Sequence, residues 1–157
     1  MGLQRSTESV LYSFPALPAS VPEARNVVAS LAARHGASWD DLERIRLVVS
    51  EAVTNAVVHA YDEEVGNVHL TAAVISGDLT VVVSDDGCGW GCAGPSPGLG
   101  LGLGLVANAC QALSIVARPY GGTQLEMRLT LCAREREHVV SRPAAQAEAS
   151  LFSFEGR

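Results

Sequence analysis

Three polar residues, Glu51, Asn55 and His59, follow one another at four-residue steps in a stretch otherwise rich in valine and alanine. On a helix this spacing places their side chains in one stripe. Because the neighbouring positions are apolar, the stripe is expected at the edge of a buried surface. A carboxylate and an amide placed there cost free energy unless they are paired or bind a ligand. A solvated helix face would explain any one of these residues, but the three together favour a binding site.

A second candidate site is the segment Asp85-Asp-Gly-Cys-Gly89, which directly follows a run rich in valine. A carboxylate at the end of a strand can accept a hydrogen bond from an exocyclic amine, such as N6 of adenine. Gly87 and Gly89 would let the backbone approach a ring closely. An Asp-Gly turn without a ligand is the alternative that these residues alone leave open.

The third candidate is the stretch Gly98-Leu-Gly-Leu-Gly-Leu-Gly104, which runs into an apolar segment expected to be helical. The free N–H groups and the dipole of a helix N-terminus attract phosphate, and glycines allow close contact. A flexible linker is the alternative, but a linker would not alternate glycine with leucine.

Two better-known glycine motifs do not fit the sequence. There is no GxxxxGK[ST], so the chain has no P-loop. The spacing GxGxxG occurs at Gly89, Gly91 and Gly94, but Pro95 and Pro97 follow it where a dinucleotide-binding fold would have a helix.

The surrounding chain supplies elements that can position these groups. Ser20 is expected to cap a first helix that stops at Gly36, and Ser38 with Asp41 has the form of a capping box for a second helix. Apolar periodicity and turn residues predict, in order, a strand at 9–14, helices at 20–36 and 38–59, strands at 68–75 and 79–84 joined by a turn at Gly77-Asp78, a helix at 101–113, and a hairpin of strands 112–118 and 123–131.

The order β, α, α, β, β, α, β, β predicts an α+β fold: a two-layer α/β sandwich with a mainly antiparallel mixed sheet and helices on one face. Both hairpins argue against a doubly wound parallel sheet. Residues 1–131 are expected to form a single domain, and the polar, Ala/Ser-rich residues 132–157 a flexible tail. Within that tail, Leu151–Phe154 is apolar enough to dock on a partner.

Composition limits the classes of partner. The formal net charge is −6, from 17 acidic and 11 basic residues, and no Lys/Arg cluster is present, which argues against nucleic acid. No segment approaches the roughly 20 apolar residues of a membrane-spanning helix, and the first residues do not resemble a signal peptide. The four cysteines include no CxxC pair, so they suit free thiols in a reducing cytoplasm. A zinc site at Cys88 and Cys92 would need two further ligands that have no obvious source.

Taken in order, these motifs resemble the GHKL ATPase superfamily, which includes gyrase, Hsp90, histidine kinases and the mismatch-repair protein MutL. The resemblance consists of E-x-x-x-N on a helix, D-x-G-x-G after a strand, G-x-G opening a helix, and Gly122-Thr123 before the last strand, and it runs from about Ser20 to Leu131. Within the superfamily, the phrase from Glu51 to Tyr61 and the small size resemble the bacterial anti-sigma-factor serine kinases.

The resemblance implies a histidine-kinase-like ATPase (Bergerat) fold that binds ATP with Mg²⁺. It implies that Asn55 coordinates Mg²⁺, that Glu51 is the general base, and that Asp85 binds the adenine amino group. Thr123 would support Asp85, often through water. The residues expected to bind ATP on this basis are Asn55, His59, Asp85, Gly87, Gly89, Gly100, Gly102, Gly104 and Thr123.

One departure from the family concerns the lid over the phosphates. The corresponding stretch, Cys92 to Pro97, is short and has no Lys or Arg, whereas kinase members often place a basic residue there. Arg118 and Arg128 are the candidates to replace it.

The leading hypothesis is a serine/threonine protein kinase that phosphorylates an antagonist protein and sequesters a sigma factor. The resemblance also implies that the protein can form a homodimer. The alternative is a non-catalytic, ATP-gated protein-binding module, which the bare lid favours. The catalytic domain of a histidine kinase would need a dimerising helical hairpin, for which the chain leaves no room. A DNA-linked ATPase would need a second domain and a basic surface.

Overall fold

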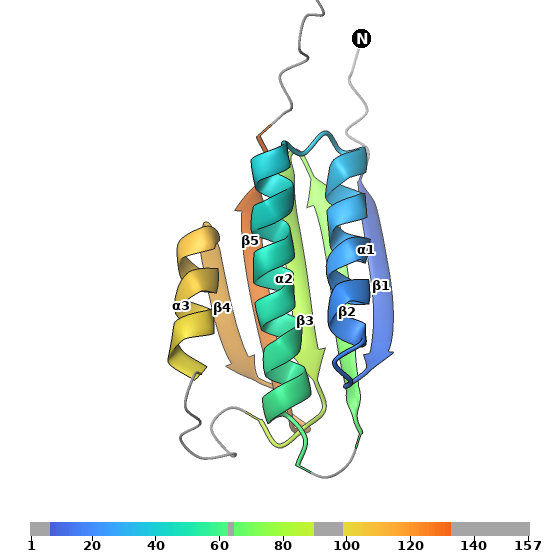
Figure 1. The fold of residues 1–157 in the computed structure, drawn as a ribbon, viewed down its shortest axis with the longest axis vertical. Helices are drawn as coiled ribbons and strands as arrows, with labels where there is room; N and C mark the ends of the chain where they lie inside the picture. Colours follow the sequence, from blue (N-terminus) through green and yellow to red (C-terminus); the bar gives the residue numbers. More distant parts are fainter. Residues whose placement is uncertain (1–6, 63–64, 90–98, 133–157) are drawn as a thin grey trace, which may run out of the picture.

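The computed structural model describes residues 7–62, 65–89 and 99–132. Three helices and five strands follow one another in the predicted order (Figure 1). Their bounds are β1 Glu8–Pro15, α1 Ser20–Arg34, α2 Trp39–His59, β2 Asn67–Ile75, β3 Asp78–Asp85, α3 Leu99–Ala109, β4 Ala112–Ala117 and β5 Thr123–Thr130.

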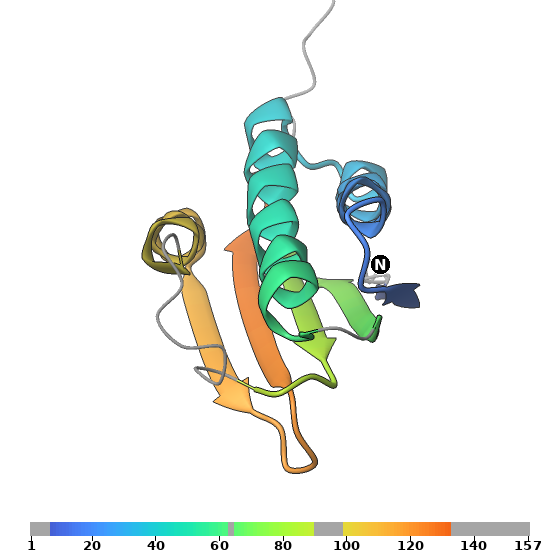
Figure 2. The same cartoon turned by 60° about the horizontal axis from the view of Figure 1, so that its bottom comes forward.

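The five strands form one sheet in the order β1-β2-β3-β5-β4, and each pair of neighbours is antiparallel. All three helices lie on one face of this sheet and leave the other face open (Figure 2). The predicted two-layer α+β sandwich is confirmed. The sheet expected to be mixed is antiparallel throughout its described strands.

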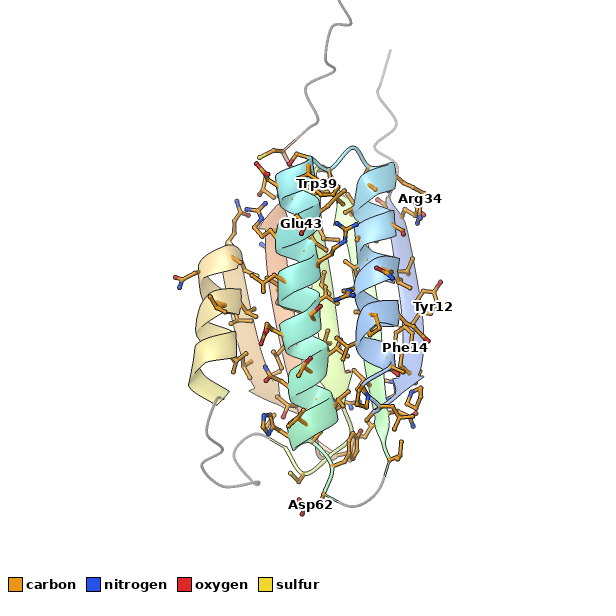
Figure 3. The ribbon with its side chains drawn as sticks, viewed as in Figure 1. Tyr12, Phe14, Arg34, Trp39, Glu43 and Asp62 are labelled. Carbon is orange, nitrogen blue, oxygen red and sulfur yellow. The ribbon has the colours of Figure 1, made fainter. Side chains whose placement is uncertain are left out.

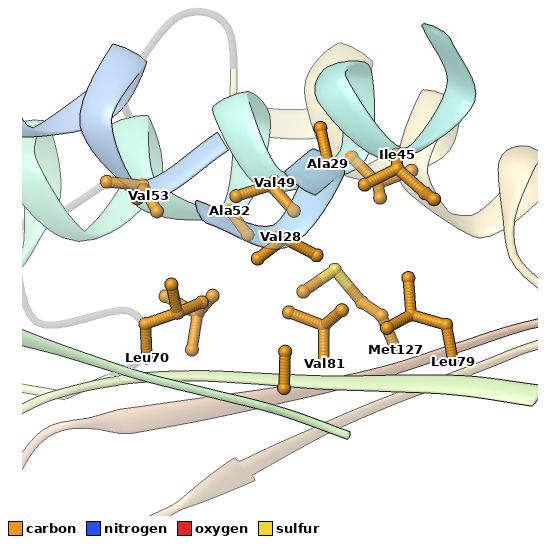
Figure 4. Close-up of a cluster of buried hydrophobic side chains, with 14 of the residues drawn as sticks. Val28, Ala29, Ile45, Val49, Ala52, Val53, Leu70, Leu79, Val81 and Met127 are labelled. Atoms are coloured by element: carbon orange, nitrogen blue, oxygen red, sulfur yellow. The ribbon is translucent and has the colours of Figure 1, made fainter. Parts of the chain in front are cut away.

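The core lies between the helices and the covered face of the sheet. Along β2, β3 and β5, buried and more exposed residues alternate, as the period of two in a strand requires. Figure 4 shows how Val28 of α1 and Val49 of α2 meet Leu70, Val81 and Met127 of the sheet. Each such side chain stabilises the fold by about 1.5–3 kcal/mol when fully buried. In the described ranges no helix is long and apolar enough to span a bilayer.

The start of α1 differs from the prediction. Ser20 does not cap the helix; the N-cap is Ala19, which makes no side-chain cap hydrogen bond. Carbonyl groups of the preceding turn, those of Leu17 and Pro18, accept from the N–H groups of Ser20 and Val21. The Ser20 hydroxyl is then free to donate to the carbonyl of Pro15 at 2.7 Å. Backbone carbonyls therefore do the work expected of a capping side chain.

Two further boundaries need correction. The β2–β3 turn is centred on Ser76 and Gly77, both with positive φ, and Ile75 pairs with Asp78, so the turn lies one residue earlier than predicted. Helix α3 begins at Leu99 and ends at Ala109, not at residue 113. The N–H of Gln111 donates to the carbonyl of Arg128, which already commits the chain to the last hairpin.

The capping box at the start of α2 is confirmed and extends beyond a local cap. Asp41, only 3% exposed, accepts from the backbone and hydroxyl of Ser38, from Arg44 at 2.6 Å, and from the N–H of Cys132 at 2.8 Å. Burial alone would raise the pKa of Asp41. The hydrogen bonds of Ser38 and Cys132 and the charge of Arg44 outweigh burial, so that pKa is lowered. This carboxylate ties the first turn of α2 to the end of the sheet.

Replacing Asp41 by alanine is expected to lower the free energy of unfolding by about 3 kcal/mol, because a cap and several charge-assisted hydrogen bonds are lost together. Urea unfolding measures the change, and Asp40→Ala, an exposed neighbour in the same turn, is the matched control. Since the folded pKa is depressed, the contribution is complete above the ordinary aspartate pKa of about 3.9 and is lost as pH falls through the folded value. A difference between the two variants that stayed constant down to pH 2 would contradict this account.

The division into a domain of residues 1–131 and a tail of residues 132–157 stays a prediction, because beyond Cys132 the tail lies outside the described residues.

Candidate nucleotide-binding site

The predicted site residues gather at one end of the molecule. The C-terminal end of α2, the end of β3, the beginning of β5 and the beginning of α3 all lie at the lower end in Figure 1. Figure 3 shows the direction of α2. Trp39 and Glu43 lie at the end away from the site, and Asp62, shortly after the helix ends at His59, lies at the site end. Antiparallel pairing causes this gathering, because β3 ends where its neighbour β5 begins.

The stripe on α2 has the predicted surroundings. Glu51, Asn55 and His59 are each partly exposed, whereas Ala52 and Val53 beside them are buried. The three polar side chains therefore lie along the border of the core, and His59 is the last residue of the helix.

Glu51 reaches the first turns of α3. Its Oε2 atom lies only 2.4 Å from the position that a Cβ atom would take at Gly102, so a side chain there would displace the carboxylate. The first four N–H groups of a helix have no partner within it and carry partial positive charge. Gly100 and Gly102 fall within the first four residues of α3, while Gly104 lies in the next turn. The Glu51 carboxylate thus lies next to the helix end at which an anion is favoured.

Asn55 carries an unsatisfied polar group. Its Nδ2 atom is buried and has no hydrogen-bond partner among the described residues. An orphaned buried amide nitrogen costs about 1–3 kcal/mol. Rotation of the amide by half a turn presents its oxygen at the same place. An amide oxygen is a ligand that Mg²⁺ accepts, and Mg²⁺ in nucleotide sites is held by one or two side chains plus phosphates and water. The residue therefore fits the metal role.

Asp85 is the buried polar residue at the end of β3. The alternation that buries Leu79, Val81 and Val83 continues to Asp85, which is 4% exposed. Its Oδ1 atom accepts from the N–H groups of Gly87 at 2.9 Å and Thr123 at 3.2 Å. Its Oδ2 atom receives no hydrogen bond from the described residues, so one carboxylate oxygen stays available to an amine.

Thr123 occupies the matching position at the beginning of β5. It is 6% exposed and starts the alternation that continues with Leu125 and Met127 on the covered face of the sheet. Its N–H contacts Asp85 directly. The structure thus brings together two residues that lie 38 positions apart in the sequence.

Gly87 and Gly122 allow the backbones around Asp85 to approach one another. A Cβ atom at Gly87 would lie 2.0 Å from the carbonyl oxygen of Ala60, at the end of α2. A Cβ atom at Gly122, where φ is +89°, would lie 2.0 Å from the carbonyl oxygen of Asp85. Both contacts are with rigid backbone, so only glycine fits. Gly89 is the last residue described before the stretch 90–98, which holds the predicted lid.

A polar cluster on the open face of the sheet supports this corner. Asp86 accepts from Arg118 and lies 2.6 Å from Nε2 of His69. Its N–H donates to the hydroxyl of Tyr61, which also donates to the carbonyl of Asn67 at 2.6 Å. The hydrogen bond with His69, followed by that with Arg118, lowers the pKa of Asp86. From the sequence, Arg118 was named only as a candidate lid residue and Tyr61 only as part of the phrase that begins at Glu51. The cluster around Asp86 was missed, because nothing local indicates the contacts of Asp86.

Neither arginine proposed to replace a basic lid residue lies on the side of Glu51. Arg118 is bonded to the backbone and side chain of the Asp85–Asp86 pair. Arg128 is exposed on β5 at a position that alternates with buried Met127, so it faces away from the helices.

The prediction for the cysteines also changes. Cys110 and Cys132 are free, whereas Cys88 is disulfide-bonded, so the four are not all thiols.

A five-stranded sheet in the order β1-β2-β3-β5-β4, with the three described helices on one face, defines the class of fold. The chain belongs to the family of histidine kinase-like ATPase domains, whose sequence model matches residues 14–129.

Among individual proteins, the chain is similar to the serine-protein kinase RsbW of Bacillus velezensis, with 38% identity over 86 residues and 54% of each chain covered. It is 36% identical over 87 residues to the protein of the same name from Staphylococcus epidermidis. The matches span about half the length of these relatives. A crystal structure of the RsbU and RsbW domains of Mycobacterium tuberculosis Rv1364c shares the fold, with a TM-score of 0.62 at 22% identity, over 79% of this chain and 32% of that one.

Proposed function

We propose that this protein is an Mg–ATP-dependent serine/threonine protein kinase of the anti-sigma-factor type, which phosphorylates an antagonist protein and sequesters a sigma factor in the cytoplasm. The observation that carries the proposal is the corner formed by Asp85 and Thr123, because it leaves one carboxylate oxygen of a buried aspartate for an amine. The names of the similar proteins, serine-protein kinases, support the choice of reaction. Dimerisation is part of the proposal but rests on the resemblance alone.

In this proposal Asp85 accepts a hydrogen bond from the adenine amino group, and Gly87 and Gly89 line the ring. The N–H groups at the beginning of α3, with Gly100 and Gly102, face the phosphates, while Gly104 and His59 border the nucleotide. Asn55 holds Mg²⁺ through its amide oxygen, and the metal supplies charge neutralisation on the phosphates. Phosphoryl transfer depends mainly on such positioning and neutralisation.

Glu51 is proposed as the general base. Its carboxylate is held at the phosphate end of the site and can take the proton from a serine hydroxyl of the partner. The proton would pass from that hydroxyl to Glu51 as the serine oxygen bonds to the γ-phosphorus and the bond from that phosphorus to the β,γ-bridging oxygen breaks, so that ADP leaves with that oxygen.

The proposed function is tested by measuring transfer of the labelled γ-phosphate of ATP to candidate antagonist proteins that carry a serine. Gel filtration then tests whether the protein forms a complex with a sigma factor. We expect stoichiometric labelling of one serine that requires Mg²⁺. Absence of labelling in every ATP-binding preparation would reject the kinase activity.

A second candidate function is a non-catalytic module whose partner binding is gated by ATP. The placement of Arg118 and Arg128 away from Glu51 favours it, because neither arginine is positioned to stabilise developing charge on the phosphates. This candidate predicts partner affinity that differs between ATP, ADP and no nucleotide, without phosphate transfer. Equal affinity in the three states, measured by calorimetry, would exclude it.

Gly102→Ala is expected to slow phosphate transfer by roughly 10- to 100-fold while leaving the fold intact. The added methyl group meets the mobile end of Glu51, so the carboxylate is pushed aside, and a displacement of about 1 Å at a catalytic group costs up to about 100-fold. Alanine also favours a helix over glycine by about 1 kcal/mol, so stability should not fall. Single-turnover kinetics and thermal unfolding measure the two effects.

Gly104→Ala adds the same group further along the helix, where nothing lies within 4 Å, so the difference between the two variants reports on the surroundings of Gly102, where Glu51 and the phosphates meet. Equal rates for the two variants would show that the position of Glu51 does not matter.

A further inference from the structure

The two ladders of β3 end at different residues near Asp85. On the side of β5, the last pair of residues in register is Ser84 with Gln124. On the side of β2, Asp85 itself pairs with Val68, and the strand then stops. The backbone of Asp85 therefore has a ladder partner on the side of β2 but none on the side of the hairpin that carries Thr123, so on that side its carbonyl is open to another contact.

Arg118 makes that contact. Its Nη1 atom donates to the carbonyl oxygen of Asp85 at 2.6 Å and also to the carboxylate of Asp86. The arginine lies in the turn between β4 and β5, where its N–H donates to the carbonyl of Gly122 at 3.0 Å and its carbonyl accepts from Gly121 at 3.2 Å. One nitrogen therefore joins the end of β3 to the turn that presents Thr123.

The charged groups around Arg118 strengthen its contact with the end of β3, and they lie on the face of the sheet opposite to the Asp85 carboxylate. Asp86 also lies against His69 of β2, whose side chain is on the open face of the sheet. Asp85, the residue before Asp86 and the last residue of β3, points to the opposite, covered face, because successive residues alternate. Arg118 and Asp86 thus hold the backbone from one face while the Asp85 carboxylate stays free to bind on the other.

From this geometry we infer that Arg118 is a positioning residue for adenine recognition: it fixes the Asp85 backbone so that the free carboxylate oxygen meets the amino group of the base. The inference rests on the proposed binding of ATP at Asp85. It assigns to Arg118 a role in selecting the base and not in stabilising the phosphates.

The test compares binding of ATP with binding of purine riboside triphosphate, which lacks the 6-amino group, by calorimetry in the presence of Mg²⁺. The wild type should prefer ATP, because only ATP satisfies the oxygen of Asp85. Arg118→Ala should weaken ATP binding by about tenfold, the order seen when an outer partner of a binding group is removed. It should leave purine riboside triphosphate nearly unaffected, so that the preference collapses. A general loss of stability would weaken both ligands alike.

Arg118→Lys is the conservative variant that should restore most of the preference, because both contacts are made by a single nitrogen. Arg128→Ala, on the open face of β5, is the control and should bind as the wild type does. If Arg118→Ala does not fold, Asp86→Asn carries the test, since it removes the charge that holds Arg118; a reduced preference is expected, and an unchanged one overturns the inference.

The outcomes separate the inference from the proposed function. A wild type that binds no ATP rejects the proposed function and the role of Arg118 with it. A wild type that prefers ATP, with Arg118→Ala showing the same preference, overturns the inference alone.

Discussion

Asp85→Asn should weaken ATP binding by about 100-fold without unfolding the protein. The amide oxygen of asparagine can still accept from Gly87 and Thr123, so the local fold keeps both hydrogen bonds. The other position, now an NH₂ group, would face the amino group of adenine, donor against donor. Losing a charge-assisted hydrogen bond and leaving buried donors unpaired costs about 2.7 kcal/mol, which corresponds to the stated factor.

Calorimetric titration of ATP and GTP into the variant checks this prediction. Guanine presents a carbonyl oxygen where adenine has its amine, so the loss should be much smaller for GTP. Asp78→Asn is the matched control at the other end of β3, where the side-chain oxygen accepts from the hydroxyl of Thr130. Equal weakening of both nucleotides by Asp85→Asn would show that Asp85 does not contact the base.

Glu51→Gln should leave ATP binding nearly unchanged and slow phosphate transfer by roughly 100- to 10,000-fold, the range that a positioned general base contributes. Glutamine has the same shape but cannot take a proton at neutral pH. The Glu51 side chain lies beside the beginning of α3, and glutamine fills the same space. The substitution therefore tests the base and not the packing of the two helices.

Binding by calorimetry and single-turnover transfer to the antagonist protein separate the two effects. Glu43→Gln, on the same helix and paired with Arg46, is the control and should transfer phosphate at the wild-type rate. If Glu51→Gln transferred phosphate as fast as the wild type, Glu51 would not be the base. If the wild type bound ATP but transferred nothing, the ATP-gated module would be the better account.

Local pattern was sufficient to predict much of the fold and the placement of several candidate site residues. The period of two in β3 ends on Asp85, so a polar residue is carried to the buried face at the end of a strand. The capping box of Ser38 and Asp41 marks the beginning of α2, and the four-residue spacing of Glu51 and Asn55 places them on one stripe of it. These features depend only on neighbours in the sequence.

The features that the sequence did not reveal depend on contacts between distant segments. Arg118 meets Asp85 and Asp86 only because β4 and β5 pair and turn beneath the end of β3, over a separation of more than 30 residues. Ser20 was expected to cap a helix, but carbonyls of the preceding turn took that role. The beginning of α3 was misplaced because alternating glycine and leucine carries no clear start signal for a helix.

Titration of ATP into the wild-type protein, with Mg²⁺ and with EDTA in its place, tests the central claim most directly. We expect saturable binding at one site per chain that weakens markedly when Mg²⁺ is removed, because in the proposed site Asn55 and the phosphates would both ligate the metal. Absence of any binding at millimolar ATP with Mg²⁺ would contradict the nucleotide site and, with it, the proposed kinase.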